Sequence, residues 1–546
     1  MAAHPPQSAD RALRHGLLPW ALAALAGLAQ AASLAWPGPG SLGGQPLWWL
    51  QILSLALLGR VLLEAGSTRR AGLLGWLFAL AWLAGTFWWL FISMHVYGGL
   101  AAPLAVLAVL ALAAFLGAYY AVASACFRAV APANRALAAI VFASMWLLAE
   151  LARGQWWTGF PWGAGGYAHV QGPLAALARS LGVYGIGAAA AVLALLLAQA
   201  RRADLRSARA WALALALAAV GVGAAWQRHC ALEGCGTDGP ATDAATDGAP
   251  LSLALLQGNI PQDEKFQPGS GVPLALRWYF DQLHAAQADL VVAPETAIPL
   301  LPSQLMPGYL EGIAKRYATG HQALLLGIPL GSLEDGYTNA VLGFAPGQST
   351  PYQYDKHHLV PFGEFIPPFF RWFTEMMNIP LGDFNRGAIG QPSLAWGSQR
   401  IAPNICYEDL FGEELGARFL HPASGPTIMV NLSNIGWFGN TVAIDQHLAI
   451  SQMRALEFER PMVRATNTGA TAVIDHRGQV THRMPAFERG VLLAQVQGRS
   501  GAVTPYAWWV ARWGLWPLWA LGLGVAAVAW RAQRRAAARG AALRGC

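Results

Sequence analysis

The chain has 546 residues, of which 55% are hydrophobic and 12% are charged, whereas about 25% of the residues of an average soluble domain are charged. This composition, with 24 Trp and 60 Gly, excludes a disordered protein and argues against an ordinary soluble enzyme. The formal net charge is +7, but residues 251–500 contain 16 basic and 21 acidic residues. The excess of basic residues therefore lies elsewhere, beside apolar segments, which is typical of a membrane protein and not of a nucleic-acid-binding protein.

Eight apolar segments are long enough to cross a membrane, since a spanning helix needs about 20 mostly apolar residues. They are residues 17–36, 47–65, 71–92, 100–127, 136–151, 183–198, 210–226 and 507–530. The first segment could instead belong to a cleaved signal peptide, because Arg11 and Arg14 precede it and Ala29-Gln30-Ala31 resembles a cleavage site. We favour a span there because the run is long and other spans follow it.

Clusters of arginine predict the orientation of these spans. One cluster precedes the first span (Arg11 and Arg14), and another follows the eighth (Arg531, Arg534, Arg535, Arg539 and Arg544). The others lie between the second and third spans (Arg69 and Arg70), between the fourth and fifth (Arg128 and Arg135), and between the sixth and seventh (Arg201, Arg202, Arg206 and Arg209). With eight spans, all of these clusters lie on one side of the membrane, which is the cytoplasmic side by the positive-inside rule. We therefore expect both termini in the cytoplasm and residues 251–500 on the periplasmic side of a bacterial inner membrane.

The remaining sequence predicts one α/β domain. Residues 233–250 are small, polar and glycine-rich, so we expect a flexible linker there. After the linker, apolar strand segments alternate with helical periodicity over about 250 residues, enough to bury one core. Strands are expected at 251–257, 290–293, 323–328, 340–344, 401–405, 427–432 and 462–466, a hairpin is expected whose first strand is 470–475, and helices are expected at 272–287, 309–319 and 447–459. The predicted organisation is a membrane domain with seven spans (1–232), the linker (233–250), the α/β domain (251–500), and the last span with a basic tail (501–546).

One cysteine is a candidate nucleophile. Cys406 follows the strand that ends at Ile405 and precedes Tyr407-Glu408-Asp409, where we expect a helix to begin. A thiol at a strand-to-helix turn is exposed, and a helix N-terminus favours the thiolate. The alternative is a buried structural cysteine, since free cysteines are often buried.

The other cysteines do not suggest a second site. Cys126 lies in a predicted span and Cys546 on the cytoplasmic tail, while Cys230 and Cys235 are close enough in sequence to form a disulfide in an oxidising compartment. The spacing of Cys and His residues does not match a zinc site. We therefore expect no metal or other cofactor.

A lysine and a glutamate are candidates to act in catalysis together with Cys406. The chain has three lysines, and Lys356 lies in the mostly apolar stretch 354–364, where its compact ammonium group could stabilise an oxyanion. Glu295 follows the apolar strand 290–293 and Pro294, so its carboxylate could be desolvated and act as a base. Each residue alone is equally compatible with a structural ion pair.

In this order, Glu295, Lys356 and Cys406 resemble the Glu-Lys-Cys triad of the nitrilase superfamily of carbon-nitrogen hydrolases. Together with the eight spans, they make the chain similar to the apolipoprotein N-acyltransferase family. Further segments that carry the resemblance are Gly159-Phe160-Pro161-Trp162, Gln257-Gly258-Asn259-Ile260-Pro261-Gln262, Arg454-Ala455-Leu456-Glu457 and Arg464-Ala465-Thr466-Asn467-Thr468-Gly469. The chain departs from the family at Phe266, where we expect Trp, and at Ile435-Gly436, which interrupt an Asn-Asp-x-Trp-Phe-like pattern.

The resemblance implies a polytopic α-helical membrane protein with an inserted nitrilase-like αββα sandwich. It also implies transfer of a fatty acyl chain from a membrane phospholipid, through a thioester on Cys406, to the N-terminal diacylglyceryl-cysteine of an apolipoprotein, the last step of bacterial lipoprotein maturation. Glu295 would be the general base and Lys356 would stabilise the oxyanion. Glu364, Tyr407 and Glu408 would support them. No cofactor is implied, because the acyl ester supplies the energy.

Three other interpretations remain open from the sequence. A membrane-tethered amidase would use the same triad with water as the acceptor. A transporter is disfavoured because charges are scarce in the middle of the predicted spans, and a lipid-binding protein without activity is disfavoured because all three triad positions are filled. The apolar stretch 365–384 is further interpreted as a membrane-dipping arm that gates lipid entry, with packing inside the domain as the alternative.

Overall fold

The computed structural model describes residues 16–201, 204, 249–332, 334–348, 350–368, 370–372 and 383–544. Contacts divide the chain into two units. One unit comprises Met1–Trp88, Val106–Asp238 and Leu515–Cys546, and the other comprises Trp89–Ala105 and Gly239–Gly514. The predicted seventh span, Cys230, Cys235, Cys546, most of the predicted linker and residues 373–382 of the predicted arm lie outside the described residues.

The second unit contains two six-stranded sheets. The first sheet has the order β12-β1-β2-β3-β4-β5, and the second has the order β11-β10-β9-β8-β7-β6. Parallel pairing joins the central strands β1, β2 and β3 in one sheet and β7, β8 and β9 in the other. The strands are β1 (Leu251–Gln257), β2 (Leu290–Ala293), β3 (Ala323–Ser332), β4 (Gly336–Phe344), β5 (Tyr352–Asp355), β6 (Leu394–Trp396), β7 (Gln399–Ile405), β8 (Ile428–Ser433), β9 (Met462–Thr466), β10 (Ala472–Ile474), β11 (Val480–Arg483) and β12 (Gly490–Val496).

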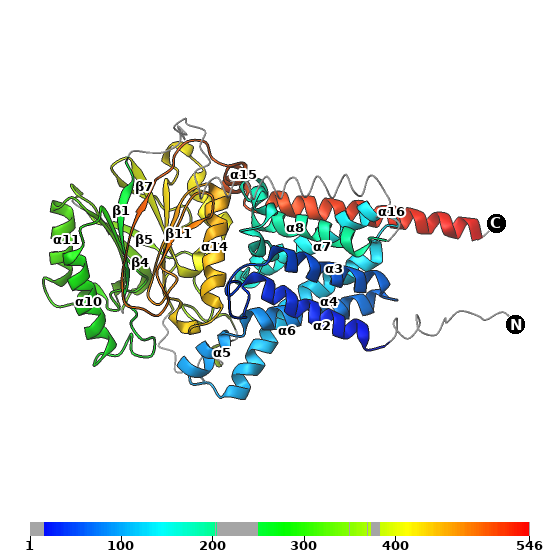
Figure 1. Ribbon diagram of the computed structural model, residues 1–546, viewed down its shortest axis with the longest axis horizontal. Coiled ribbons are helices and arrows are strands. Elements are labelled where there is room, and N and C mark those ends of the chain that lie inside the picture. The colour runs from blue at the N-terminus through cyan, green and yellow to red at the C-terminus, as the bar shows by residue number, and fades with distance from the viewer. Residues whose placement is uncertain are drawn as a thin grey trace. The chain divides into compact units, whose positions relative to one another are not determined.

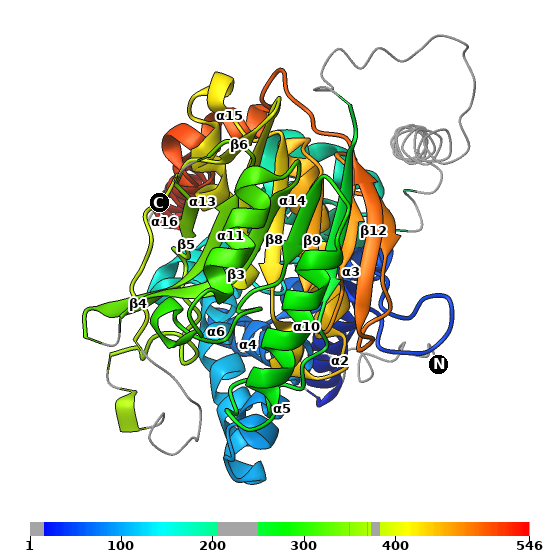
Figure 2. The ribbon, with the colours of Figure 1, turned by 90° about the vertical axis from the view of Figure 1, so that its left-hand side faces the viewer.

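The two sheets pack face to face, and helices cover their outer faces. The core between the sheets joins side chains such as Leu255 and Val292 of the first sheet to Ile405 and Val430 of the second. Helices α10 (Gly271–Ala285) and α11 (Tyr309–Thr319) cover the first sheet (Figure 2), and α14 (Ala443–Phe458) packs on β9 and β10 of the second. Because the central strands are buried on both faces, their sequences are almost continuously apolar. The expected α-β-β-α layering is confirmed.

The structure corrects several local predictions in this unit. Strands β5, β6 and β12 were not predicted, and the helix expected after Cys406 is a short 3-10 turn, Cys406–Leu410, followed by α13 (Gly412–Gly416). The third predicted span, 71–92, ends early, because α4 stops at Phe87. Trp89 belongs to the α/β unit, where its indole nitrogen donates a hydrogen bond to Gln446 Oε1 (3.1 Å) and its ring lies 4.2 Å from that of Phe438.

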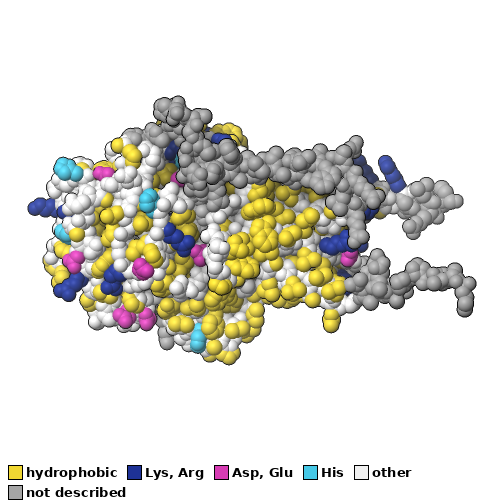
Figure 3. Space-filling view, viewed as in Figure 1, with side chains coloured by type: hydrophobic (Ala, Val, Ile, Leu, Met, Phe, Trp, Pro, Cys, Tyr) yellow, Lys and Arg dark blue, Asp and Glu magenta, His cyan; other side chains and the backbone are white. Residues whose placement is uncertain are grey.

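The first unit is a bundle of apolar helices (Figure 1). Four helical segments of the described residues are long and apolar enough to cross a membrane: Thr68–Phe87, Ala102–Val130, Arg135–Thr158 and Pro173–Ala198. Figure 3 shows hydrophobic side chains covering the visible face of this unit, as expected for contact with lipid. Its helices are α2 (Leu18–Leu34), α3 (Trp48–Glu64), α4 (Thr68–Phe87), α6 (Ala102–Val130), α7 (Arg135–Gln155), α8 (Ala178–Ala198) and α16 (Trp516–Arg544).

The eighth predicted span is not one continuous helix. Residues 507–530 are divided between α15 (Pro505–Trp513) and α16, and Gly514 between them has φ +53°. Such a conformation ends a helix and is easily adopted only by glycine. If this broken pair is counted as one span, the described residues contain five candidate spans.

Candidate active site

The three predicted catalytic residues each follow the carboxyl end of a strand in the α/β unit. Glu295 follows β2, Lys356 follows β5 and Cys406 follows β7. Glu295 and Lys356 are buried, with 7% and 1% of their surfaces exposed, and Cys406 is partly buried. In α/β proteins, the carboxyl ends of parallel strands are the usual place for ligand-binding side chains.

Hydrogen bonds fix both oxygens of the Glu295 carboxylate. Its Oε1 accepts hydrogen bonds from Lys356 Nζ (3.2 Å) and Asn339 Nδ2 (2.8 Å). Its Oε2 accepts one from the main-chain N–H of Asn434 (2.8 Å), which follows β8. Donors from within β4 and from the residues that follow β5 and β8 therefore orient this carboxylate.

Lys356 lies between two carboxylates. Its Nζ is 3.2 Å from Glu295 and 2.9 Å from Glu364. Asn339 donates to both of the same carboxylates, at 2.8 Å to Glu295 and 2.7 Å to Glu364. Glu364 also accepts the main-chain N–H of Val360 (2.8 Å), so it holds the loop that follows Lys356. The structure thus places Glu364, one of the predicted supporting residues, in direct contact with Lys356.

Cys406 lies at a strained turn between β7 and the 3-10 turn. Its φ is +53°, a left-handed conformation that is uncommon for residues other than glycine. Its carbonyl oxygen accepts a hydrogen bond from Asn431 Nδ2 (3.0 Å) and lies 3.3 Å from His447 Nε2. These contacts hold a conformation that the isolated chain would seldom adopt.

A buried ionic cluster supports this turn. Asp409, in the 3-10 turn, contacts His447 Nε2 through Oδ1 (3.0 Å) and Arg464 Nη1 through Oδ2 (3.1 Å). All three side chains are at most 1% exposed. Because a buried charge is stable only when paired, the cluster links the nucleophile turn to α14 and β9.

The electrostatics of the site keep the thiol protonated and the carboxylate ionised. Burial, followed by the negative charge of Glu295, raises the pKa of Cys406 to about 12, although Lys356 opposes this. Burial also acts to raise the pKa of Glu295, but the ammonium groups of Lys356 and Lys265 and the hydrogen bonds from Asn339 and Lys356 outweigh it and lower that pKa. The expectation that a helix N-terminus favours the Cys406 thiolate is therefore wrong, because no such helix forms and burial dominates.

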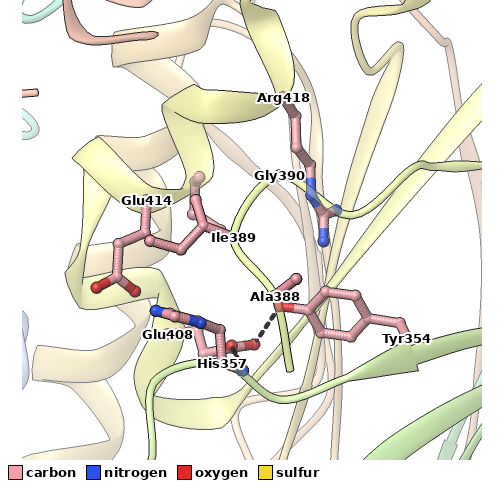
Figure 4. A pocket seen from close by; sticks show the side chains of 9 residues that line it. Tyr354, His357, Ala388, Ile389, Gly390, Glu408, Glu414 and Arg418 are labelled. Atoms are coloured by element: carbon pink, nitrogen blue, oxygen red, sulfur yellow. Dashed lines mark hydrogen bonds between the residues drawn. The ribbon is translucent and has the colours of Figure 1, made fainter. Parts of the chain in front are cut away.

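Glu408 connects the Lys356 loop to the Cys406 turn. Its Oε2 accepts hydrogen bonds from Tyr354 Oη (2.8 Å) and the N–H of Ile405 (2.6 Å), and its Oε1 accepts those of His357 (2.7 Å) and His358 (3.2 Å). Figure 4 shows Glu408 between Tyr354 and His357. The hollow drawn there has a volume of about 10 Å³, room for about one water molecule and not for an acyl chain.

The side chain of Tyr407 is buried beside two other rings. It is 4% exposed, and its ring lies 5.3 Å from Phe411 and 5.6 Å from His358.

The sequence did not single out three polar residues of this site. Asn339 and Asn434 bind the Glu295 carboxylate, and Lys265 Nζ donates a hydrogen bond to the Glu295 main-chain oxygen (3.1 Å). Asn339 carried no distinguishing pattern in the sequence, whereas Asn434 begins the Asn-Asp-x-Trp-Phe-like pattern that Ile435-Gly436 interrupt. For Lys265, the rarity of lysine in this arginine-rich chain was a usable indication. In the described part of the chain, no group of three or more His, Cys, Asp or Glu side chains could hold a metal ion.

The fold and this constellation define a nitrilase-like α/β domain in a chain that also carries a bundle of apolar helices. Residues 28–196 match the family described as apolipoprotein N-acyltransferase N-terminal domain, and residues 252–505 match the carbon-nitrogen hydrolase family. The chain is 66% identical to the apolipoprotein N-acyltransferase of Verminephrobacter eiseniae over 96% of this chain and 98% of that protein. It is 45% identical to the enzyme of the same name from Ralstonia nicotianae, over 90% of each chain. The chain belongs to the apolipoprotein N-acyltransferase family, as the sequence predicted.

Solved structures with low sequence identity are similar to about half of the chain. A carbon-nitrogen hydrolase from Helicobacter pylori G27 is 14% identical and covers 50% of this chain and 94% of its own, with a TM-score of 0.34. A mutant of the Nesterenkonia AN1 amidase from the nitrilase superfamily is 18% identical and covers 50% of this chain and 99% of its own, with a TM-score of 0.35.

Proposed function

We propose that this protein transfers a fatty acyl chain from a membrane phospholipid to the α-amino group of the diacylglyceryl-cysteine at the N-terminus of an apolipoprotein. The observation that carries the proposal is the Glu295 carboxylate held by Lys356 beside the Cys406 turn, in a chain of the apolipoprotein N-acyltransferase family. The proposed catalytic residues are Glu295, Lys356 and Cys406, with Glu364 and Glu408 as positioning residues. Tyr407, whose ring lies near those of Phe411 and His358, is proposed as a packing support of the turn.

In the first half-reaction, the Cys406 sulfur attacks the carbonyl carbon of the phospholipid ester while Glu295 accepts the thiol proton. Because the pKa of the resting Cys406 thiol is raised to about 12, the thiol is neutral and needs Glu295 to take its proton. Lys356, whose pKa is raised by the two carboxylates despite its burial, remains cationic and can stabilise the oxyanion. The ester C–O bond then breaks, and the lysophospholipid oxygen leaves with the proton from Glu295.

In the second half-reaction, the α-amino group of the acceptor attacks the thioester carbonyl carbon. Glu295 accepts the proton that the amine loses as the amide bond forms. The C–S bond breaks, and Cys406 regains its proton. No cofactor takes part in either half-reaction, and no group of the site needs to change its oxidation state.

We further propose that the chain crosses the bacterial inner membrane eight times, with both termini in the cytoplasm and residues 251–500 on the periplasmic side. The apolar helices of the first unit and the arginine clusters beside them support this topology. Both substrates are lipids, so the site must accept acyl chains from the bilayer. Phe370 and Trp372 of the proposed arm are exposed, which fits contact with lipid.

The test is the intact mass of the detergent-purified protein after incubation with phospholipid alone. Wild type should gain one fatty acyl group that hydroxylamine removes, and Cys406→Ala should gain none. A synthetic diacylglyceryl-cysteine peptide should then discharge the thioester and become N-acylated. A thioester that decays equally fast without the peptide would instead identify a hydrolase, and the absence of any adduct on wild type would refute the catalytic proposal.

A further inference from the structure

Lys265 is a second buried lysine beside Glu295. It lies in the loop between β1 and α10, and only 2% of its surface is exposed. Its Nζ donates a hydrogen bond to the main-chain oxygen of Glu295 (3.1 Å). Lys315, the remaining lysine besides Lys356, is exposed on α11. Two of the three lysines of this chain therefore lie buried at Glu295, Lys356 at its carboxylate and Lys265 at its main-chain oxygen.

The loop that carries Lys265 packs closely against the first residue of α10. The N–H groups of Glu264 and Gln267 donate hydrogen bonds to Pro261 O (3.1 Å) and Glu264 O (2.7 Å). At Gly271, the first residue of α10, a Cβ atom would lie 2.1 Å from Glu264 O and 2.9 Å from Lys265 N. Only glycine allows this close approach of the loop to the helix, so the position of Lys265 is fixed by the backbone around it.

The ammonium group of Lys265 is buried without a carboxylate group paired to it in the part of the chain that the structure describes. Among the described residues it forms no ion pair, and a buried ammonium group without a carboxylate partner is costly. Burial accordingly lowers the pKa of Lys265 to about 8, while Glu295 and Cys406 act in the opposite direction. An apolar side chain of the same length would avoid this cost, so the retained lysine points to a role in the site.

Its electrostatic partner is the proposed base. The charged groups that act on Glu295 are Lys356 and Lys265, both of which favour its ionised form. Lys356 is shared with a second carboxylate, Glu364, at 2.9 Å, whereas Lys265 is not. Glu295 and Lys356 also affect the Cys406 thiol: the negative charge of Glu295 raises its pKa and the positive charge of Lys356 lowers it.

We propose that Lys265 is a positioning residue of the acyl-transfer site, which orients Glu295 through its main-chain carbonyl and keeps its carboxylate ionised until it accepts the proton of Cys406. This inference rests on the proposed function, because it assigns to Lys265 a task in the chemistry of Glu295 and Cys406. Lys265 itself forms and breaks no covalent bond.

The test compares four variants of the full-length protein in the thioester assay. Lys265→Gln can keep a donor for the carbonyl but removes the charge, Lys265→Met removes both, and Lys265→Arg keeps the charge. Lys315→Met removes an exposed lysine of the same unit and is the matched control. The rate of thioester formation with phospholipid is measured against pH for each variant, and thermal unfolding checks that each is folded.

Loss of a neighbouring positive charge should raise the pKa of Glu295 by about one unit. The midpoint of the acid limb of the pH profile should therefore move up by about one pH unit in Lys265→Gln and Lys265→Met, and remain in place in Lys265→Arg and Lys315→Met. Lys265→Met should also be slower, by about tenfold at its optimum, because the Glu295 carbonyl loses its donor.

The outcomes separate this inference from the proposed function. If wild type forms the thioester and folded Lys265→Gln has the wild-type pH profile, Lys265 does not act on the base and the inference is overturned. If Lys265→Met does not fold, Lys265→Gln still decides the role of the charge. A wild-type protein that forms no thioester would refute the proposed function itself.

Discussion

Replacing Glu408 by alanine should destabilise the α/β unit and remove the hydrogen bonds that join the loop of Lys356 to the turn of Cys406. The carboxylate accepts four hydrogen bonds, from Tyr354 Oη and from the main-chain N–H groups of Ile405, His357 and His358. It is 2% exposed, so water cannot replace it without a rearrangement. Burial raises the pKa of Glu408, whereas Lys356 and the hydrogen bonds that the carboxylate accepts act in the opposite direction.

The magnitude follows from the donors that lose their acceptor. A buried donor without a partner costs about 1–3 kcal/mol, so three main-chain N–H groups give a lower limit of about 3 kcal/mol in the free energy of unfolding. For a domain of this size, each kcal/mol lowers the unfolding temperature by about 2–4 °C. We therefore expect Glu408→Ala to lower it by about 6–12 °C. Glu408→Gln, which keeps one acceptor oxygen, should lie between Glu408→Ala and wild type.

The assay is thermal unfolding of the detergent-purified protein followed by intrinsic fluorescence, with Glu311→Ala on the exposed surface of α11 as the control. Thioester formation by Glu408→Ala should also slow at temperatures where it remains folded, because Glu408 joins the loop of Lys356 to the turn of Cys406. An unfolding temperature within about 2 °C of wild type would show that the hydrogen bonds to Glu408 do not stabilise the α/β unit by the predicted amount.

Three further predictions address the base, the backbone and the thiol. Glu295→Gln should slow thioester formation by about 10²–10⁴-fold, the contribution of a general base, measured at a temperature where thermal unfolding shows the variant to be folded; a loss below about threefold would exclude Glu295 as the base. Gly327→Ala should lower the unfolding temperature, because a Cβ there would lie 2.2 Å from Pro294 O beside the Glu295 turn, and unchanged unfolding would contradict that steric argument. Since the pKa of Cys406 is raised to about 12, its alkylation by iodoacetamide should rise about tenfold per pH unit from about pH 7 to pH 9, measured by intact mass against Cys406→Ala. A plateau within this range would mean that the thiol is more acidic than the structure indicates.

The sequence identified the elements whose physical constraints are local. Strands β1, β2, β7, β8 and β9 were predictable because burial on both faces demands a continuous apolar run. Strands β5, β6 and β12 were not, because all three lie at sheet edges and their pairing involves partners that the sequence pattern does not specify. The same local reasoning located most of the apolar helices but not the ends of α4 and α15, which depend on tertiary packing and on the conformation of Gly514.

For the site, the sequence determined the residue types that could carry the chemistry and their places after strands. Tertiary structure alone decided which groups share the Glu295 carboxylate: Asn339 from within β4, Lys356 from the end of β5, and Asn434 from the opposite sheet. It also reversed the expected acidity of Cys406, because burial and a nearby carboxylate outweigh any local turn effect. Hydrogen bonds and charges act over a few ångströms in space and not along the chain, so these properties exist only once the two sheets have packed together.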